Sequence, residues 1–313
     1  MNKKNKELLM KYKSVIGLIV FSLIIAVLND RFLTVSNILN VFKQTSINSV
    51  IAAGMTFIIL TGGIDLSVGS TLALSGAIAA SLLASGTPMI VAVISAILLG
   101  AFIGFLNGII IAKGKVQPFI ATLAMMTIIR GVTLIFTNGR PISTGDFSGA
   151  EIFSFIGSGK VFGIPFPIII TIVVFAIAYY ILKNTSLGRY VYALGGNEEA
   201  TKLSGINVMQ VKYKAYAISG ALAAVAGLIV TARLSSAQPQ AGSGYELDAI
   251  AAVVLGGTSL AGGKGGVIGT IIGALIIGIL NNALNLMDVT SYYQLLIKGI
   301  VILVAVLIDR DSE

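Results

Sequence analysis

The chain is divided by long apolar runs, most of which have the length that a helix needs to cross a lipid bilayer. A window of about 19 residues separates ten of them. They cover residues 14–33, 42–60, 66–84, 89–112, 119–137, 166–182, 213–234, 245–257, 267–284 and 294–308. Because backbone polar groups inside a bilayer need partners within the protein, each run is predicted to be helical. The sequence therefore predicts an all-α, polytopic transmembrane helix bundle, a single domain over residues 1–313.

The eighth run, 245–257, is short for a full crossing and is bounded by glycines. It is predicted as either a continuous or a re-entrant helix, and the sequence does not decide between the two. The first run follows a basic segment, residues 1–13, as the apolar core of a signal peptide would. It ends in Leu28-Asn29-Asp30-Arg31, however, without the small residues of a cleavage site. We therefore expect a retained first helix preceded by a basic cytoplasmic tail.

The basic residues of the loops are distributed unequally between the two sides that ten crossings would create. The predicted outer side holds only Arg31, Lys43, Arg140, Lys160 and Arg233. The other side holds the basic tail and most of the remaining Lys and Arg residues. Since cytoplasmic loops carry the excess of positive charge, both termini are predicted to be cytoplasmic.

The composition excludes several other classes of protein. With 56% hydrophobic and 11% charged residues, the chain has too little polar surface for a soluble globule. Its net charge of +8 is spread over short loops, which does not indicate a nucleic-acid site. The absence of Cys and His excludes disulfides, thiolate or imidazole metal sites and histidine-dependent nucleophiles. We expect no catalytic residue, no metal and no cofactor.

Two charges fall inside predicted spans, where they need a partner, water or an interface. Lys298 lies near the end of its span and is predicted to extend to the membrane surface, whereas Arg130 is the better candidate for a buried partner or an aqueous path. Small residues four apart in two spans predict close internal helix packing rather than a subunit contact. These are Gly100, Gly104 and Gly108, and Gly269 with Gly273.

The long polar interval 183–214 is predicted to be a loop in water that contains a short surface helix. Residues 198–204 lack Gly and Pro, Asn197 can cap their start, and Gly205 can end them. Ala200 and Leu203 give this helix a small apolar face that a soluble partner could contact. On the predicted outer side, residues 138–165 form the longest loop, with a short helix near Glu151.

The sequence does not contain an energy source for transport. A phosphate-binding loop needs the pattern G-x-x-x-x-G-K-[ST], and the nearest match, at Lys264, has Thr258 and Gly265 at two required positions. An ion-driven carrier would hold several carboxylates in its spans, and only Asp248 is a plausible one. Another protein is therefore predicted to drive transport.

Five segments carry a resemblance to a known family: residues 62–70, 193–198, 204–208, 232–239 and 244–265. The last reads GYELDAIAAVVLGGTSLAGGKG and is the most specific of them. Together they resemble the permease subunits of bacterial ABC monosaccharide importers, most closely those for ribose, and the match extends over nearly the whole chain. The resemblance implies a multi-pass protein of the bacterial cytoplasmic (inner) membrane, a cytoplasmic ABC ATPase, an extracytoplasmic sugar-binding protein and a second permease copy.

The resemblance also implies that residues 183–214 form the segment that couples the permease to its ATPase. Members of the family often show there Glu-Ala-Ala and, after three more residues, Gly. This chain has Glu199-Ala200-Thr201 and Gly205, so Thr replaces the second Ala. The predicted coupling residues are Asn197, Glu198, Glu199, Ala200, Leu203 and Gly205.

Other site residues follow less directly from the resemblance. Arg31, Arg140 and Arg233 are predicted to meet acidic groups of the binding protein, although a hydrated loop charge is the simpler interpretation of each. The expected pathway between the two copies is apolar, which would leave sugar specificity mainly to the binding protein. Candidate gate or pathway residues are Gly62, Gly63, Asp65, Arg130, Asp248, Gly256 and Gly257.

Two alternatives stay open on the sequence. The chain could be a self-sufficient secondary carrier or channel for a small polar solute. It could also be a permease of the same kind for xylose, galactose or a furanosyl signalling molecule.

Overall fold

The structure is a computed structural model that describes residues 13–145 and 149–310. The predicted basic tail lies almost wholly outside these ranges. Thirteen helices form the described part of the chain. They are α2 (Lys13–Leu28), α3 (Val35–Leu60), α4 (Val68–Ala84), α5 (Met89–Ala112), α6 (Pro118–Thr137), α7 (Ala150–Ser158), α8 (Phe166–Asn184), α9 (Ser186–Gly196), α10 (Glu198–Leu203), α11 (Val208–Leu234), α12 (Tyr245–Leu255), α13 (Val267–Leu286) and α14 (Ser291–Arg310).

Each of the ten apolar runs overlaps one of these helices, so the prediction of an all-α bundle is confirmed. Within the described residues, five helices are long and apolar enough to cross a membrane by length and composition. They are α5, α6, α8, α11 and α13.

The ends of the first two runs were predicted wrongly. Helix α2 ends at Leu28, and residues 29–34 form a turn that was assigned to the first run. Helix α3 begins at Val35, where the hydroxyl of Thr34 accepts a hydrogen bond from the backbone N–H of Asn37 at 3.3 Å. Its first turns are polar, so a hydropathy window misses them.

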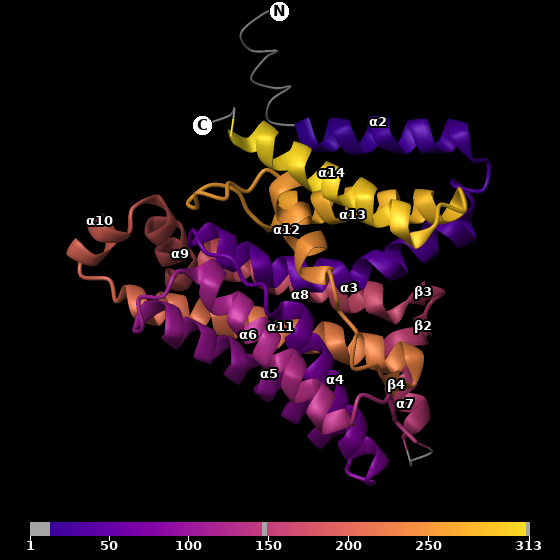
Figure 1. Cartoon of the computed structure of the whole chain (residues 1–313). Coiled ribbons are helices and arrows are strands. Elements are labelled where there is room, and N and C mark those ends of the chain that lie inside the picture. The colour runs from indigo at the N-terminus through magenta and orange to yellow at the C-terminus, as the bar shows by residue number, and fades with distance from the viewer. Residues whose placement is uncertain (1–12, 146–148, 311–313) are drawn as a thin grey trace, which may run out of the picture.

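The bundle has two sides with a shared centre (Figure 1). Helices α2, α13 and α14 lie along one side, and α4, α5 and α6 lie along the other. Helix α3 packs on α13 of the first group, α11 packs on α4 and α5 of the second, and α3 and α11 pack on each other and hold most of the buried core. Of the five long apolar helices, α5, α6 and α8 are the more exposed, and α11 and α13 are the more buried. This arrangement suits a bilayer, because lipid takes the place of a soluble protein's polar surface.

Glycines at intervals of four allow α5 and α11 to pack with their backbones in close contact. A Cβ at Gly100 would collide with the carbonyl of Gly220, and a Cβ at Gly104 would collide with the carbonyl of Tyr216. Gly269 and Gly273 allow α13 to pack against α12 with the same close backbone contact. The prediction that both glycine stripes serve internal packing is confirmed.

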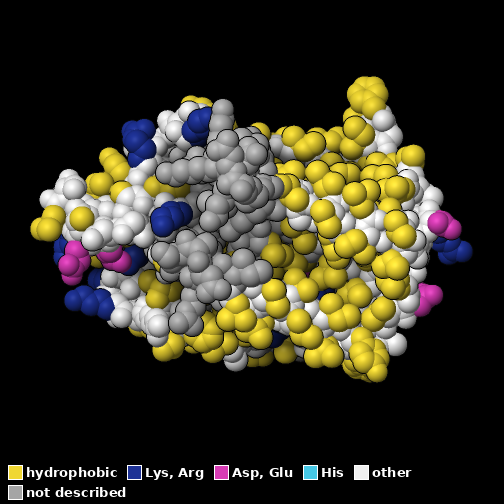
Figure 2. All heavy atoms as spheres, turned by 90° about the horizontal axis from the view of Figure 1, so that it is seen from above, with side chains coloured by type: hydrophobic (Ala, Val, Ile, Leu, Met, Phe, Trp, Pro, Cys, Tyr) yellow, Lys and Arg dark blue, Asp and Glu magenta, His cyan; other side chains and the backbone are white. Residues whose placement is uncertain are grey.

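Charged side chains gather at the two ends of the bundle. Figure 2, which looks onto the α2–α14 side, shows a broad hydrophobic surface with basic and acidic groups at its left and right margins. The left end carries α9 and α10, and the right end carries α7 (Figure 1). The apolar band between the two ends is therefore the part of the molecule that suits lipid.

Helix α12 resolves the open question about the eighth run. It has 11 residues, which gives about 16 Å of helix and only half of a hydrocarbon core. The segment before it, 235–244, folds irregularly within the bundle. Strand β4 (Ser236–Ala237) pairs there with β1 (Ile142–Ser143), and a Cβ at Gly69 on α4 would collide with the carbonyl of Gly242. The run is thus a short helix preceded by an irregular segment, 235–244.

The long segment 138–165 is more structured than a simple loop. The helix predicted near Glu151 is present as α7, and it packs on the end of α11, where a Cβ at Gly157 would collide with the backbone of Arg233. Phe153 of α7 is buried. A short antiparallel pair, β2 (Lys160–Val161) and β3 (Ile164–Pro165), completes the segment. None of these strands was predicted.

Candidate functional site

A short surface helix and a polar pocket

Helix α10 is the short helix that the sequence predicted. The side chain of Asn197 accepts a hydrogen bond from the backbone N–H of Ala200 at 2.9 Å and caps its start. Gly205 follows its end with φ of +80°, a left-handed conformation that favours glycine. Lys212 pairs with Glu198 across 2.8 Å and ties α10 to the start of α11.

The outward face of α10 is free in the structure. Glu199 and Ala200 are exposed, and the side chain of Leu203 is 88% exposed. Thr201 points the other way: it is buried, and its hydroxyl donates to the carbonyl of Asn197 at 2.7 Å. The departure from the family pattern at Thr201 therefore lies on the inward face, and the surface open to a partner is unaffected.

The prediction that residues 183–214 form a loop with one short helix was wrong in its extent. Helix α9 occupies residues before α10, and α11 begins at Val208. Leu187, Val191 and Leu194 occur at helical spacing on α9, and the last two are buried. That spacing was the signal available in the sequence.

Helix α9 connects α10 to the interior of the bundle. A Cβ at Gly195 would collide with the carbonyl of Leu60, at the end of α3, and with the backbone N–H of Gly263. The N–H of Gly263 in turn donates to the Leu60 carbonyl at 3.0 Å. The hydroxyl of Tyr192 donates to the carbonyl of Gly265 at 3.0 Å, and burial raises the pKa of this tyrosine, which keeps the donor protonated.

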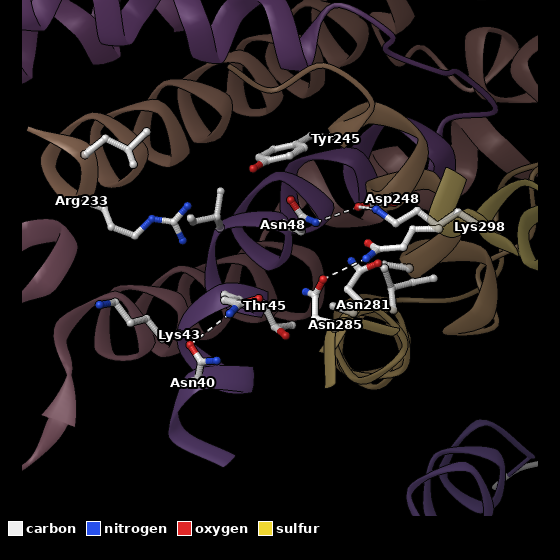
Figure 3. Close-up of a pocket in the computed structure, with 18 residues that line it drawn as sticks. Asn40, Lys43, Thr45, Asn48, Arg233, Tyr245, Asp248, Asn281, Asn285 and Lys298 are labelled. Atoms are coloured by element: carbon white, nitrogen blue, oxygen red, sulfur yellow. Dashed lines mark hydrogen bonds and ion pairs between the residues drawn. The ribbon is translucent and has the colours of Figure 1, made fainter. Parts of the chain in front are cut away.

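A polar pocket of about 550 Å³ lies at the opposite end of the bundle from α10. It is formed by the first half of α3, the end of α11, the start of α12, the end of α13 and the start of α14 (Figure 3). Six amide side chains line it: Asn40, Gln44, Asn48, Asn281, Asn285 and Gln294.

An ion pair stands in the wall of this pocket. The ammonium of Lys298 on α14 lies 3.1 Å from Oδ2 of Asp248 on α12, and the amide of Asn48 on α3 donates to the same oxygen at 3.1 Å. Asp248 is buried. The prediction that Lys298 merely extends to the membrane surface was wrong, because a carboxylate within the bundle pairs with it.

Arg130 holds the irregular segment before α12. One of its terminal nitrogens donates to the carbonyls of Pro239 at 2.5 Å and Ala241 at 3.0 Å. The expectation of a buried partner is therefore met by backbone carbonyls. These two groups would otherwise lack partners in an irregular segment, so the arginine supports the fold there.

The remaining gate candidates do not form one cluster. Gly62 and Gly63 line a second pocket beside α10, at the end of the bundle that carries α9. Gly62 and Gly257 have φ of +75° and +85°, as turn glycines do, and Gly256 packs against the backbone of Gly269. These glycines have structural reasons to be present.

Asp65 also serves the fold. It is buried, and it accepts hydrogen bonds from the backbone and hydroxyl of Ser67 at 2.9 and 2.7 Å. The hydroxyl of Ser219 on α11 lies 3.4 Å from its second oxygen. Asp65 thus organises the turn that starts α4.

The three arginines proposed for docking a binding protein separate into two groups. Arg31 and Arg140 are exposed in turns at the end of the bundle away from α10. Arg233 is half-buried and lines the polar pocket, as Figure 3 shows. It is therefore placed to face the contents of that pocket.

The amides of the pocket were not singled out from the sequence. Asn40, Gln44 and Asn48 occur at intervals of four, as do Asn281 and Asn285, so each set shares one helix face. Amides with this spacing in otherwise apolar segments were the signal that could have found the site. Within the described ranges, no group of three or more His, Cys, Asp or Glu side chains could hold a metal.

Relationship to known proteins

The chain matches a family model described as "Branched-chain amino acid transport system / permease component" over residues 37–306. It is 60% identical to a ribose import permease protein of Haemophilus influenzae, over 96% of this chain and 94% of the relative. It is 53% identical to the ribose import permease protein of Bacillus subtilis, over 95% and 92%. A xylose transport system permease of Haemophilus influenzae is 37% identical, over 96% of each chain. No solved structure matches. The chain belongs to this family of membrane transport permease components.

Proposed function

We propose that the chain is the membrane subunit of an ATP-binding-cassette importer that passes ribose across the cytoplasmic membrane. The observation that carries the proposal is the near full-length similarity to ribose import permeases of two distant bacteria, at 60% and 53% identity. Relatives named for xylose are less similar, at 37%. The alternative is a permease of the same mechanism for xylose, galactose or a furanosyl signalling molecule.

The proposed topology has ten membrane passages with both termini in the cytoplasm. Helix α12 enters with its re-entrant lead, and the other nine passages are α2, α3, α4, α5, α6, α8, α11, α13 and α14. Two facts support this arrangement. The α9–α10 segment and the segment 138–165 lie at opposite ends of the bundle (Figure 1), and basic residues favour the end with α10.

Helix α10 is the proposed docking element for a cytoplasmic ABC ATPase. Its exposed Leu203 can enter an apolar groove, and its N-terminal acids Glu198 and Glu199 suit the helix dipole. The Asn197 cap and the Lys212 pair hold it in one conformation. A helix that is fixed in this way can transmit a displacement of the ATPase instead of unfolding under it.

The proposed route of that displacement runs through α9. Gly195, in the last turn of α9, contacts Leu60 at the end of α3 and Gly263 in the segment between α12 and α13. These contacts connect α9 to α3, α12 and α13, which all line the polar pocket. ATPase closure at α10 would therefore act on α12 and α13 as well as on the flanking helices α8 and α11.

An extracytoplasmic sugar-binding protein and a second copy of this chain complete the proposed assembly. The exposed Arg31 and Arg140 at the outer end can meet acidic groups of the binding protein. The exposed apolar faces of α6 and α14 provide surface for lipid or for a second permease.

Reconstitution in proteoliposomes tests the proposal against a self-sufficient carrier. Labelled ribose should accumulate only when the permease, its ATPase, the binding protein and ATP are all present. Competition with unlabelled ribose, xylose and galactose then identifies the cargo. Uphill accumulation by vesicles that hold this chain alone would overturn the proposal.

A further inference from the structure

We propose that the polar pocket is a binding site for one neutral monosaccharide within the permease itself. This inference rests on the proposed function and goes beyond it, because an apolar conduit would leave all sugar recognition to the binding protein. The site is defined by Thr45 and Asn48 of α3, Asn281 and Asn285 of α13, and Tyr245 of α12.

The pocket has a suitable size and position. Its volume of about 550 Å³ falls within the usual range of ~300–1,000 Å³ for small-molecule sites. Its walls come from the ends of α3, α11, α13 and α14 that lie away from α10, which is the outer end in the proposed topology. A sugar released outside would therefore meet this pocket before the α9–α10 end of the bundle.

Amide side chains are well suited to a polyol, since each supplies both a hydrogen-bond acceptor and two donors. Three helix turns of α3 and two of α13 present them to the same cavity, at Asn40, Gln44 and Asn48 and at Asn281 and Asn285. Polar residues are costly in a membrane bundle unless they have partners. A concentration of six amides around one cavity indicates a polar occupant.

Some of these groups lack a partner in the protein. The hydroxyl oxygen of Thr45 and the side-chain oxygen of Asn281 are buried without a hydrogen bond. Both residues line the pocket. Buried polar atoms are usually satisfied, and an exception points to water or a ligand that the protein chain does not supply.

An aromatic ring, a close helix contact and an ion pair form other parts of the pocket wall. The ring of Tyr245 faces the cavity in Figure 3, where it can cover the C–H face of a sugar ring. The Thr45 hydroxyl packs against Gly278 of α13. It fits because a glycine has no Cβ, and a Cβ at position 278 would collide with the hydroxyl. The Lys298–Asp248 ion pair closes one side of the pocket, and its two charges neutralise each other.

Two further cations, Lys43 and Arg233, line the opposite side of the pocket. They make an anionic sugar, such as a sugar phosphate, the competing class of ligand. The amides outnumber these cations, and both Lys43 and Arg233 lie on the side away from Asn281 in Figure 3. The arrangement therefore favours a neutral sugar, and the experiment includes both classes.

The chain has no cysteine, so one introduced thiol reports on one position. The full chain carrying Asn285→Cys, in nanodiscs without ATPase or binding protein, is labelled with a maleimide. D-ribose should slow the labelling in a saturable way. In the Asn285→Cys background, Asn281→Leu should raise the half-protecting ribose concentration about fivefold, the effect of one lost hydrogen bond. Gln240→Leu, at an exposed amide outside the pocket, is the matched control and should leave it unchanged.

Leu203→Cys on α10 serves as the remote reporter, and ribose should not change its labelling rate. Protection by D-ribose 5-phosphate without protection by neutral sugars would overturn the neutral-sugar assignment. No protection by any sugar, in a permease that still supports ATP-dependent uptake with its partners, would overturn the site and leave the proposed function intact. Loss of uptake in the reconstituted importer, measured separately, is the result that would count against the function.

Discussion

Lys298 of α14 and Asp248 of α12 form an ion pair at 3.1 Å, although the two residues are 50 positions apart in the sequence. Asn48 of α3 donates to the same carboxylate oxygen, so three helices meet at one atom. Both charges line the polar pocket. The pair therefore fixes the geometry of the pocket wall and joins the short helix α12 to its neighbours.

Removing one partner of this pair should cost more than removing both. Lys298→Met leaves the Asp248 carboxylate buried with a single amide donor, and we expect a loss of about 2 kcal/mol. That is below the ~3–5 kcal/mol of a fully buried pair because the Lys298 side chain is 25% exposed. Lys298→Met with Asp248→Leu should recover part of the loss. Thermal unfolding in detergent measures both, and equal stability of the single and double variants would contradict a coupled pair.

Much of the fold follows from hydropathy, and the exceptions have physical causes. Helix α3 starts before its predicted span because its first turns carry polar side chains: Asn37 pairs with Asn282 of α13, and Asn40 lines the pocket. Helix α12 could not be assigned from length alone, because its lead is held by Arg130 through long-range bonds to backbone carbonyls. No local pattern encodes those contacts.

The candidate site was predictable to different degrees at the two ends of the molecule. Helix α10 is specified locally by Asn197 and Gly205, and both act as predicted. The pocket depends on the juxtaposition of five helices, so its residues appear scattered in the sequence. Lys298 and Asp248 were each recognised as unusual charges, but only tertiary packing shows that they neutralise each other.

The surface of α10 should be essential for uptake and dispensable for folding. Glu199 is exposed and has no ion pair in the described structure, so Glu199→Lys changes the charge presented to the ATPase without breaking an internal contact. We expect uptake to fall to background while membrane insertion is unchanged. Glu198→Gln removes the pair with Lys212 and should cost less than about 1 kcal/mol of stability, and its uptake shows whether that pair is needed to hold α10. Normal uptake by Glu199→Lys would remove the docking assignment.

Gly205→Pro tests whether the shape of α10 matters as well as its charge. Gly205 has φ of +80°, and its N–H donates to the carbonyl of Lys202 at 3.0 Å. Proline fixes φ near −65° and has no N–H, so the end of α10 must rearrange. We expect uptake to be abolished, with a normal amount of protein in the membrane. Uptake at the wild-type rate would show that the conformation of this helix end is not needed for coupling.

Close packing of α5 on α11 should make Gly104 intolerant of any side chain. Gly104→Ala places a methyl group against the carbonyl of Tyr216, and overpacking of this kind costs about 1–3 kcal/mol. Gly131→Ala in α6 is the matched control, since its Cβ would meet no atom within 4 Å. The control should be neutral or stabilised by up to about 1 kcal/mol, because alanine favours helix. Unfolding in detergent distinguishes the two, and equal stability would contradict the backbone contact.

The outer arginines should affect transport in two distinguishable ways. Arg31 and Arg140 are exposed, so Arg31→Glu and Arg140→Glu should weaken docking of the binding protein most at low salt, where exposed charges act over longer distances. Arg233 is half-buried in the pocket, so Arg233→Glu should reduce uptake while docking keeps its salt dependence. Binding-protein affinity measured across a salt series, beside uptake for each variant, separates the two effects. Docking that is unchanged in both exposed variants would exclude their role in recognition. A loss of docking in Arg233→Glu alone would instead place the binding protein over the mouth of the pocket.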